Sequence, residues 1–149
     1  DYGPEAYGNF LKLCQQYDLE VAPHIVVGLH YGRLLGEIEA LRMISSVQPR
    51  HLAIVILTPL RDTPMAGVTP PSIEDCGRLL ALARLANPYA YLSLGCARPA
   101  GYQRPLLEQY ALNAGVNAIA YPGPETITLA REMALAAEFS DRCCTLTGE

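Results

Sequence analysis

Short apolar runs alternate along the chain with longer segments in which apolar and polar residues follow a helical period. The apolar runs are of strand length and span 20–28, 51–59, 90–95 and 117–121. They are apolar at consecutive positions, which is typical of strands covered on both faces of a parallel sheet. The longer segments predict helices at about 5–17, 33–47, 72–86, 106–113 and 125–138. This alternation predicts an α/β fold made of one helix followed by four strand–helix units.

Four strand–helix units are about half of a (β/α)8 barrel, a fold that usually takes ~250 residues. We therefore expect about four parallel strands with helices on the outside, in a single domain over residues 1–149 that is the C-terminal half of a TIM-type barrel. The first strand would have a free apolar edge, which natural sheets pair or cover. The missing N-terminal half barrel would come from the same chain or a partner subunit, and a homodimer closing a full barrel is the alternative.

Composition narrows the class of protein. The 149 residues are 50% hydrophobic and 17% charged with a net charge of -4, as expected for a globular domain. Lys12 is the only lysine and no basic run exists, which argues against a nucleic-acid partner. We also expect no membrane span and no secretory signal. The five cysteines contain no CxxC pair, so we expect neither a disulfide framework nor a zinc ribbon, and a cytoplasmic location.

In barrels of this kind, chemistry is carried by residues at the C-terminal ends of the strands. The first strand end, "HIVVGLHYGR", carries His24 and His30, whose imidazoles would face the same side if the strand continued. We interpret them as substrate contacts or hydrogen-bonded histidines rather than metal ligands, because no third ligand is fixed by spacing. The fourth strand end, "YPGPET", leads into a helix N-terminus that could hold an anion.

The third strand end, "GCARPAG", places a cysteine and an arginine together. Cys96 could ligate an auxiliary iron–sulfur cluster or donate a hydrogen atom to a substrate radical, and Arg98 could bind a substrate carboxylate. In the structural alternative, Cys96 is a small buried side chain and Arg98 pairs with an acid at the edge of the barrel. Cys143 and Cys144 lie in a segment without a clear period, and we assign them no role.

Four segments together resemble the C-terminal half of biotin synthase-like radical SAM proteins: "VAPHIVVGLHYGRLLGE", "LAIVILTPLRDTPMAG", "LALARLANPYAYLSLGCARPAG" and "ALNAGVNAIAYPGPE". The resemblance covers the chain up to about residue 135, and it extends to homologues related to the split lipoyl synthases. It implies a barrel in which a [4Fe-4S] cluster and S-adenosylmethionine generate a radical that abstracts hydrogen from a substrate. The family's CxxxCxxC cluster motif is absent from these residues. The resemblance therefore implies no metal ligands in this part of the enzyme, apart from Cys96 as an auxiliary ligand.

The same resemblance assigns cofactor contacts by position. Val27 and Gly28 match the strand element that passes S-adenosylmethionine, while Ile56, Leu57 and Pro59 match the element that receives adenine. The alternative is that these aliphatic residues are barrel core.

The sequence also departs from the family pattern. Ala22 and Ser93 stand where biotin synthases carry ligands of a second, [2Fe-2S] cluster. Tyr31 stands where a carboxylate is expected after the glycine, and Glu37 lies further on. These departures speak against the sulfur-donating cluster of a true biotin synthase and favour a homologue of that enzyme. The resemblance as a whole implies sulfur insertion or a related radical step on a small carboxylic acid or acyl chain.

Two other functions remain open at this stage. A phosphate-ligand-binding barrel fragment would use "YPGPET" as its anion site, and an iron-free half-barrel subunit would only complete a partner. A Schiff-base aldolase would need a lysine at a strand end, where this chain has none.

Overall fold

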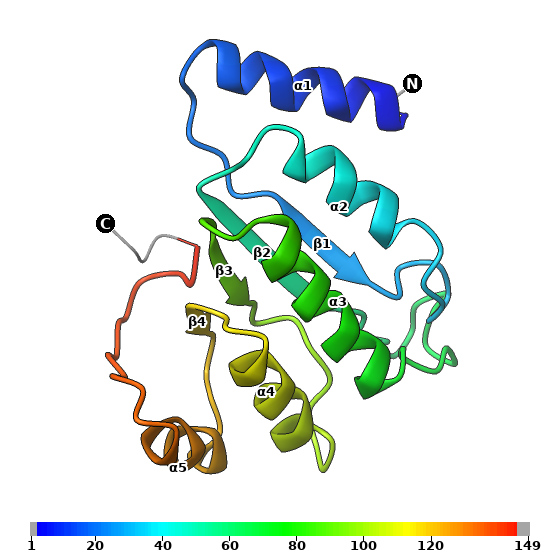
Figure 1. The fold of residues 1–149 in the computed structure, drawn as a ribbon. Helices are drawn as coiled ribbons and strands as arrows, with labels where there is room; N and C mark the ends of the chain where they lie inside the picture. Colours follow the sequence, from blue (N-terminus) through cyan, green and yellow to red (C-terminus); the bar gives the residue numbers. More distant parts are fainter. Residues whose placement is uncertain (1–2, 146–149) are drawn as a thin grey trace.

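Strands and helices alternate along the chain, as the apolar pattern predicts (Figure 1). The structure, a computed structural model, describes residues 3–145. Within this range the elements are α1 (Pro4–Gln16), β1 (His24–Val27), α2 (Glu37–Ser45), β2 (His51–Ile56), α3 (Ile73–Ala86), β3 (Tyr91–Leu94), α4 (Arg104–Asn113), β4 (Ala118–Ile119) and α5 (Pro124–Glu132).

The strands form one parallel sheet in the order β1-β2-β3-β4. Its register aligns His24 with Ala53, Ala53 with Ser93 and Ser93 with Ala118, so one row of residues crosses the sheet. Four parallel strands with five helices in the described residues are compatible with half of a TIM-type barrel, and the predicted fold class is confirmed.

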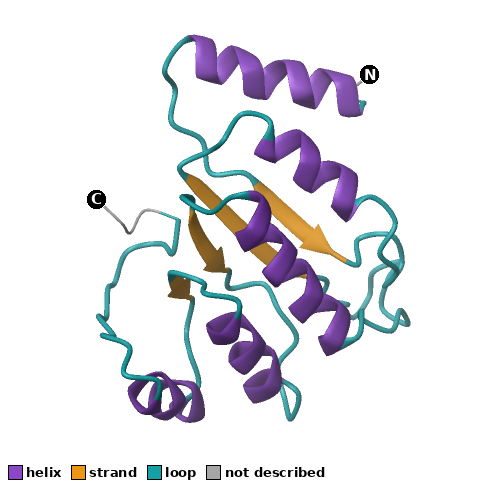
Figure 2. Cartoon of the chain, viewed as in Figure 1, coloured by secondary structure: helices purple, strands orange, loops and turns teal. Residues whose placement is uncertain are grey.

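Alternate strand residues face the helices and form the core. Helices α2, α3 and α4 lie side by side in front of the sheet (Figure 2), and each helix packs against the next along the chain. The strand residues buried beneath them are Ile25, Val27, Leu52, Ile54, Ile56, Leu92 and Leu94. The intervening strand residues have the opposite parity and define what we call the inner face, the side that would line a complete barrel. These residues are His24, Val26, His51, Ala53, Val55, Tyr91, Ser93 and Ala118.

Several elements are shorter than the sequence pattern predicts. Strand β1 ends at Val27 because Gly28 has φ +79 and turns the chain out of the strand. Helix α5 ends at Glu132 rather than 138, since Ala134 adopts a left-handed conformation with φ 56 just beyond it. Helix α3 begins as expected, with the Ser72 Oγ accepting from the Asp75 N–H at 3.1 Å.

Candidate functional site

The C-terminal ends of the four strands meet at one edge of the sheet, because all four strands are parallel. The ladder continues one residue beyond the assigned strands. The Leu57 N–H donates to Val27 O of β1 at 2.9 Å. The Gly95 N–H donates to Ile54 O of β2 at 2.8 Å, and the Ala120 N–H donates to Leu94 O of β3 at 3.0 Å. We call Gly28, Leu57, Gly95 and Ala120, with the loops that follow them, the carboxyl edge. It is where barrel enzymes of this architecture place their reacting groups.

A buried carboxylate organises the carboxyl edge at β1. The Gly28 N–H donates to Glu37 Oε1 at 2.7 Å, and the N–H groups of Leu35 and Gly36 donate to Oε2 at 2.8 and 3.1 Å. Glu37 is buried. A carboxylate therefore contacts the glycine directly, although it comes from the first turn of α2 and not from the position after the glycine that Tyr31 occupies. The sequence spacing hid it, because the intervening residues form a loop instead of extending the strand or the helix.

The loops after β1 and β2 pack so closely that two glycines are required. A Cβ on Gly28 would lie 2.6 Å from Pro71 Cδ, and one on Gly32 would lie 1.9 Å from Thr69 O. Both glycines also have positive φ, at +79 and +81, where side chains are strained. This part of the carboxyl edge is consequently a fixed wall rather than an open loop.

The residues expected to contact S-adenosylmethionine separate into two groups. The side chains of Val27 and Ile56 belong to the core beneath the helices, so only their backbone borders the carboxyl edge. Gly28 and Leu57 have the parity of the inner face, and Pro59 is half-buried in the following loop. The inner-face residues beside them are Val26 and Val55, which are paired in register and half-buried. Sequence reasoning missed this pair, although the two-residue alternation of strands carries the signal.

The aliphatic surface of Val26, Val55 and Leu57, beside the buried backbone turn at Gly28, has the chemistry to receive a flat apolar ring such as adenine. The described residues do not fit an iron–sulfur cluster in the same way. Among residues 3–145, no three His, Cys, Asp or Glu side chains are grouped so that they could hold a metal ion.

The two histidines do not share a face as the sequence suggested. His24 begins β1 and so lies at the amino end of the sheet, away from the carboxyl edge, with its Nδ1 2.7 Å from Ala22 O. His30 lies beyond β1 in a turn closed by the Gly32 N–H donating to Gly28 O at 2.8 Å. The expected continuation of the strand fails at Gly28, because a positive φ breaks the alternation. Of the two, only exposed His30 is near the carboxyl edge.

Cys96 and Arg98 follow β3 at the carboxyl edge but have different environments. Cys96 is exposed, and its thiol is free of disulfide bonds. Arg98 is buried: its Nη1 donates to Gly95 O at 2.7 Å and its Nη2 donates to Glu108 Oε1 at 2.7 Å. Arg98 thus has the pairing with an acid that the structural alternative describes, and both of its terminal nitrogens are occupied by protein acceptors. Its buried Nε has no hydrogen-bond partner among the described residues. Sequence reasoning missed Glu108, which interrupts the buried stripe of α4.

The turn "YPGPET" already holds an anion from the protein itself. The Gly123 N–H donates to Glu108 Oε2 at 2.8 Å, and the hydroxyl of Thr126 donates to the same oxygen. Burial alone would raise the pKa of Glu108, but hydrogen bonds from Arg104, Thr126, Gly123 and Arg98 outweigh it and lower the pKa to about 2. The N-terminus of α5 therefore binds an internal carboxylate, which argues against the phosphate site considered from the sequence.

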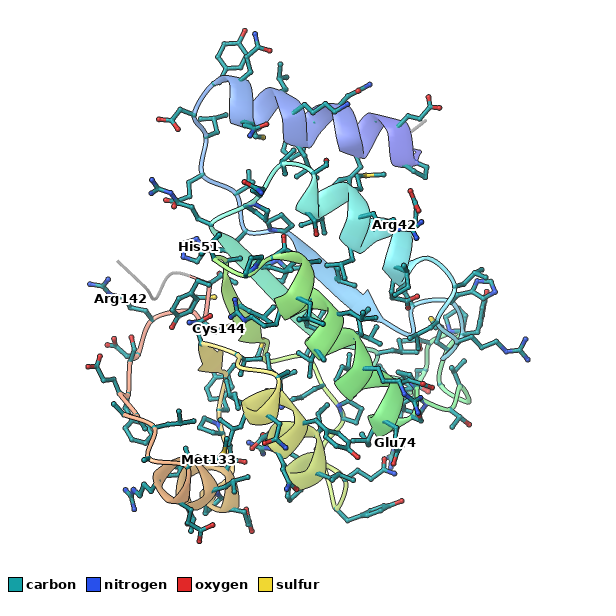
Figure 3. All side chains as sticks on the ribbon, in the orientation of Figure 1. Arg42, His51, Glu74, Met133, Arg142 and Cys144 are labelled. Carbon is teal, nitrogen blue, oxygen red and sulfur yellow. The ribbon has the colours of Figure 1, made fainter. Side chains whose placement is uncertain are left out.

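The C-terminal tail brings one more thiol to the sheet. Figure 3 shows Cys144 beside β3, where its side chain hydrogen-bonds to Ser93. Burial, followed by the charge of neighbouring Cys143, raises the pKa of Cys144. Ser93 is only 1% exposed although it belongs to the inner face. Neither Ser93 nor Ala22, which precedes β1, offers the side-chain chemistry of the second cluster's ligands.

Comparisons with known proteins give one match. The family model described as the Biotin and Thiamin Synthesis associated domain matches residues 53–135, from β2 to just beyond α5. No curated protein matches the chain. In the described residues, no helix combines the length and the apolar character needed to cross a membrane.

Proposed function

Because the chain belongs to the Biotin and Thiamin Synthesis associated family, the C-terminal domain of biotin synthase-like radical SAM proteins, we propose that it is the C-terminal part of a radical S-adenosylmethionine enzyme. The reaction we propose is sulfur insertion, or a related radical step, on a small carboxylic acid or acyl chain. S-adenosylmethionine and a [4Fe-4S] cluster would supply a hydrogen-abstracting radical when bound. The ligands of that cluster would come from outside residues 1–149, which contain no CxxxCxxC sequence.

The observation that carries this proposal is the arrangement of the carboxyl edge. An exposed thiol, Cys96, stands at the end of β3, and an aliphatic surface stands at the ends of β1 and β2. We assign the aliphatic surface, made by Val26, Val55 and Leu57, to the adenine of S-adenosylmethionine. We assign Cys96 to the substrate, either as a hydrogen-atom donor or as a ligand of an auxiliary cluster.

The shape of the sheet supports a partner for its first strand. In the described residues β1 pairs only with β2, so its other edge carries unpaired backbone groups. An unpaired edge next to apolar surface is a pairing site. We propose that the N-terminal half barrel, from the same chain or from a partner subunit, pairs there and closes the space in front of the inner face.

The test uses the complete protein that carries this chain, reconstituted anaerobically with iron and sulfide. We expect the visible absorbance of an iron–sulfur cluster and reductant-dependent release of 5′-deoxyadenosine from S-adenosylmethionine. Cys96→Ala should abolish product formation while 5′-deoxyadenosine release continues, because the cofactor surface is on other strands. Cys143→Ala, which removes another exposed thiol, is the matched control and should keep product formation.

Two results would contradict the proposal. Absence of both cluster absorbance and 5′-deoxyadenosine would favour the iron-free half-barrel subunit. Unchanged product formation in Cys96→Ala would show that the Cys96 thiol takes no part in the reaction.

A further inference from the structure

Arg98 connects the two backbone segments that follow β3 and β4 at the carboxyl edge. Besides its bonds to Gly95 O and Glu108, its Nη2 donates to Ala120 O at 2.5 Å and to Tyr121 O at 3.2 Å. The Arg98 side chain is 4% exposed, and its bonds to Gly95 O and Glu108 are buried. One guanidinium therefore fixes the ends of β3 and β4 relative to each other.

Glu108 extends this connection to the two helices that follow. Its side chain is 0% exposed, and it accepts from Arg98 Nη2 and Arg104 Nε at 2.7 Å each. Its second oxygen accepts from the Gly123 N–H and the Thr126 hydroxyl. The carboxylate consequently ties α4 and the first turn of α5 to the arginine that fixes the strand ends.

Cys96 lies between two of the fixed peptide groups. The carbonyl before it, Gly95 O, accepts from Arg98 at 2.7 Å. The carbonyl after it, Ala97 O, accepts from the Ile56 N–H at 2.8 Å. The exposed thiol thus projects from a backbone that is restrained on both sides, one of them through a buried charge.

A loop that only connected β3 to α4 would not need a buried ion pair such as Arg98–Glu108. Burying an arginine and a glutamate removes two charges from water, and well-packed apolar residues of similar volume are often at least as stable. The network nevertheless gives this loop a defined geometry, because both terminal nitrogens of Arg98 and both oxygens of Glu108 are hydrogen-bonded. Within this network, only the buried Nε of Arg98 has no hydrogen-bond partner among the described residues.

We propose that Arg98 and Glu108 are positioning residues that hold the Cys96 thiol in its working place at the carboxyl edge. This inference rests on the proposed function for the role of Cys96, but the restraint itself is a property of the fold. It replaces the substrate-binding role that the sequence suggested for Arg98.

The first test measures product formed per 5′-deoxyadenosine released in the complete enzyme. This ratio does not depend on how much enzyme is folded, so a loss of stability alone leaves it unchanged. Glu108→Gln and Arg98→Lys should each lower the ratio by about tenfold to a hundredfold, as expected when a reacting group is misplaced. Glu108→Asp, which keeps the charge, should recover part of the loss.

Arg84→Met is the matched control, because Arg84 makes a similar set of bonds at the amino ends of the same strands. It should lower both quantities together and leave the ratio unchanged. An unchanged ratio in both Glu108→Gln and Arg98→Lys would overturn the positioning role.

A second test does not need enzyme activity. It therefore still applies if the parent protein releases no 5′-deoxyadenosine, which is the result that would reject the proposed function. Amide hydrogen exchange is measured at Ile56, whose N–H donates to the carbonyl after Cys96. Each exchange rate is compared with the rate expected from that variant's own loss of unfolding free energy in urea. We expect Ile56 to exchange about tenfold faster than this in Glu108→Gln and Arg98→Lys, and at the expected rate in Arg84→Met. Exchange at the expected rate in all three variants would overturn the inference.

Discussion

Replacing Glu108 by glutamine should make the unfolding free energy of the protein depend less on pH in the acidic range. In the folded protein, burial opposes ionisation of Glu108, but its hydrogen bonds prevail and lower its pKa from the ordinary value of 4.5 to about 2. A carboxyl whose pKa is lower in the folded state stabilises it fully above the unfolded pKa. That stabilisation is lost as the pH falls through the interval from 4.5 to about 2.

The size of the effect follows from the same shift. A change from 4.5 to about 2, at 1.36 kcal/mol per pKa unit, corresponds to about 3 kcal/mol at neutral pH. Glu108→Gln also leaves Arg98 and Arg104 without a counter-charge, and breaking a buried pair on one side typically costs about 3–5 kcal/mol. We expect the variant to lose about 3 kcal/mol or more of unfolding free energy near neutral pH.

The assay is urea unfolding followed by circular dichroism, for parent and variant, at neutral pH and at several values down to about pH 2.5. The difference in unfolding free energy should shrink steadily as the pH falls below the ordinary pKa of the carboxyl. Asp75→Asn is the control, since Asp75 lies in an exposed ion pair with Arg78 and should contribute little at any pH. A difference that stays constant across this range would refute the assignment of the stabilisation to the ionised Glu108.

Three further predictions concern other parts of the chain. Arg84→Met should lower the unfolding free energy by about 2 kcal/mol in urea, because hydrogen bonds to a charged donor are lost, and an unchanged midpoint would contradict this. Gly32→Ala should cost about 2 kcal/mol or more by the same assay, as its Cβ would collide with Thr69 O, and full stability would mean that the two loops separate easily. Cys76 is buried, and burial raises the pKa of its thiol to about 12, so it should resist iodoacetamide while the exposed Cys96 reacts. Equal labelling of the two cysteine peptides in mass spectrometry would contradict this and show that α3 opens.

The fold could be predicted because it depends on a repeated local pattern. Continuous apolar runs identified the four strands, and the spacing of apolar residues identified the helices between them. The bounds were less predictable where a single backbone angle decides them. Nothing in the apolar pattern shows that Gly28 has a positive φ, so the first strand was drawn too long and the two histidines were assigned to one face. The same error made Glu37 seem remote from Gly28, to which it is hydrogen-bonded.

The candidate site was harder to predict because it depends on contacts between distant residues. Arg98 and Glu108 are ten residues apart and belong to a loop and a helix, so no helical or strand period relates them. A local signal for the pair nevertheless exists. Glu108 falls within the buried stripe of α4 formed by Leu107 and Ala111, and an acidic residue in such a stripe requires a buried partner. Cys96 was identified correctly as a strand-end residue, but the inward direction of Arg98 depends on its contact with Glu108 and is seen only in the folded structure.

The two arginine clusters explain how so short a strand as β4 keeps its place. Ala118 and Ile119 are its only assigned residues, so the ladder alone gives it few hydrogen bonds. Arg84 donates to Gly115 O just before the strand, and Arg98 donates to Ala120 O just after it. Each arginine also donates to a carbonyl at the matching end of β3. These side-chain hydrogen bonds hold β4 beside β3, as the backbone hydrogen bonds of a longer ladder would. The guanidinium of Arg98 thereby helps to set the geometry of the carboxyl edge, and a mutation can change it without removing β4. A substitution of Arg98 should therefore displace the loop that carries Cys96 under conditions in which the sheet stays folded.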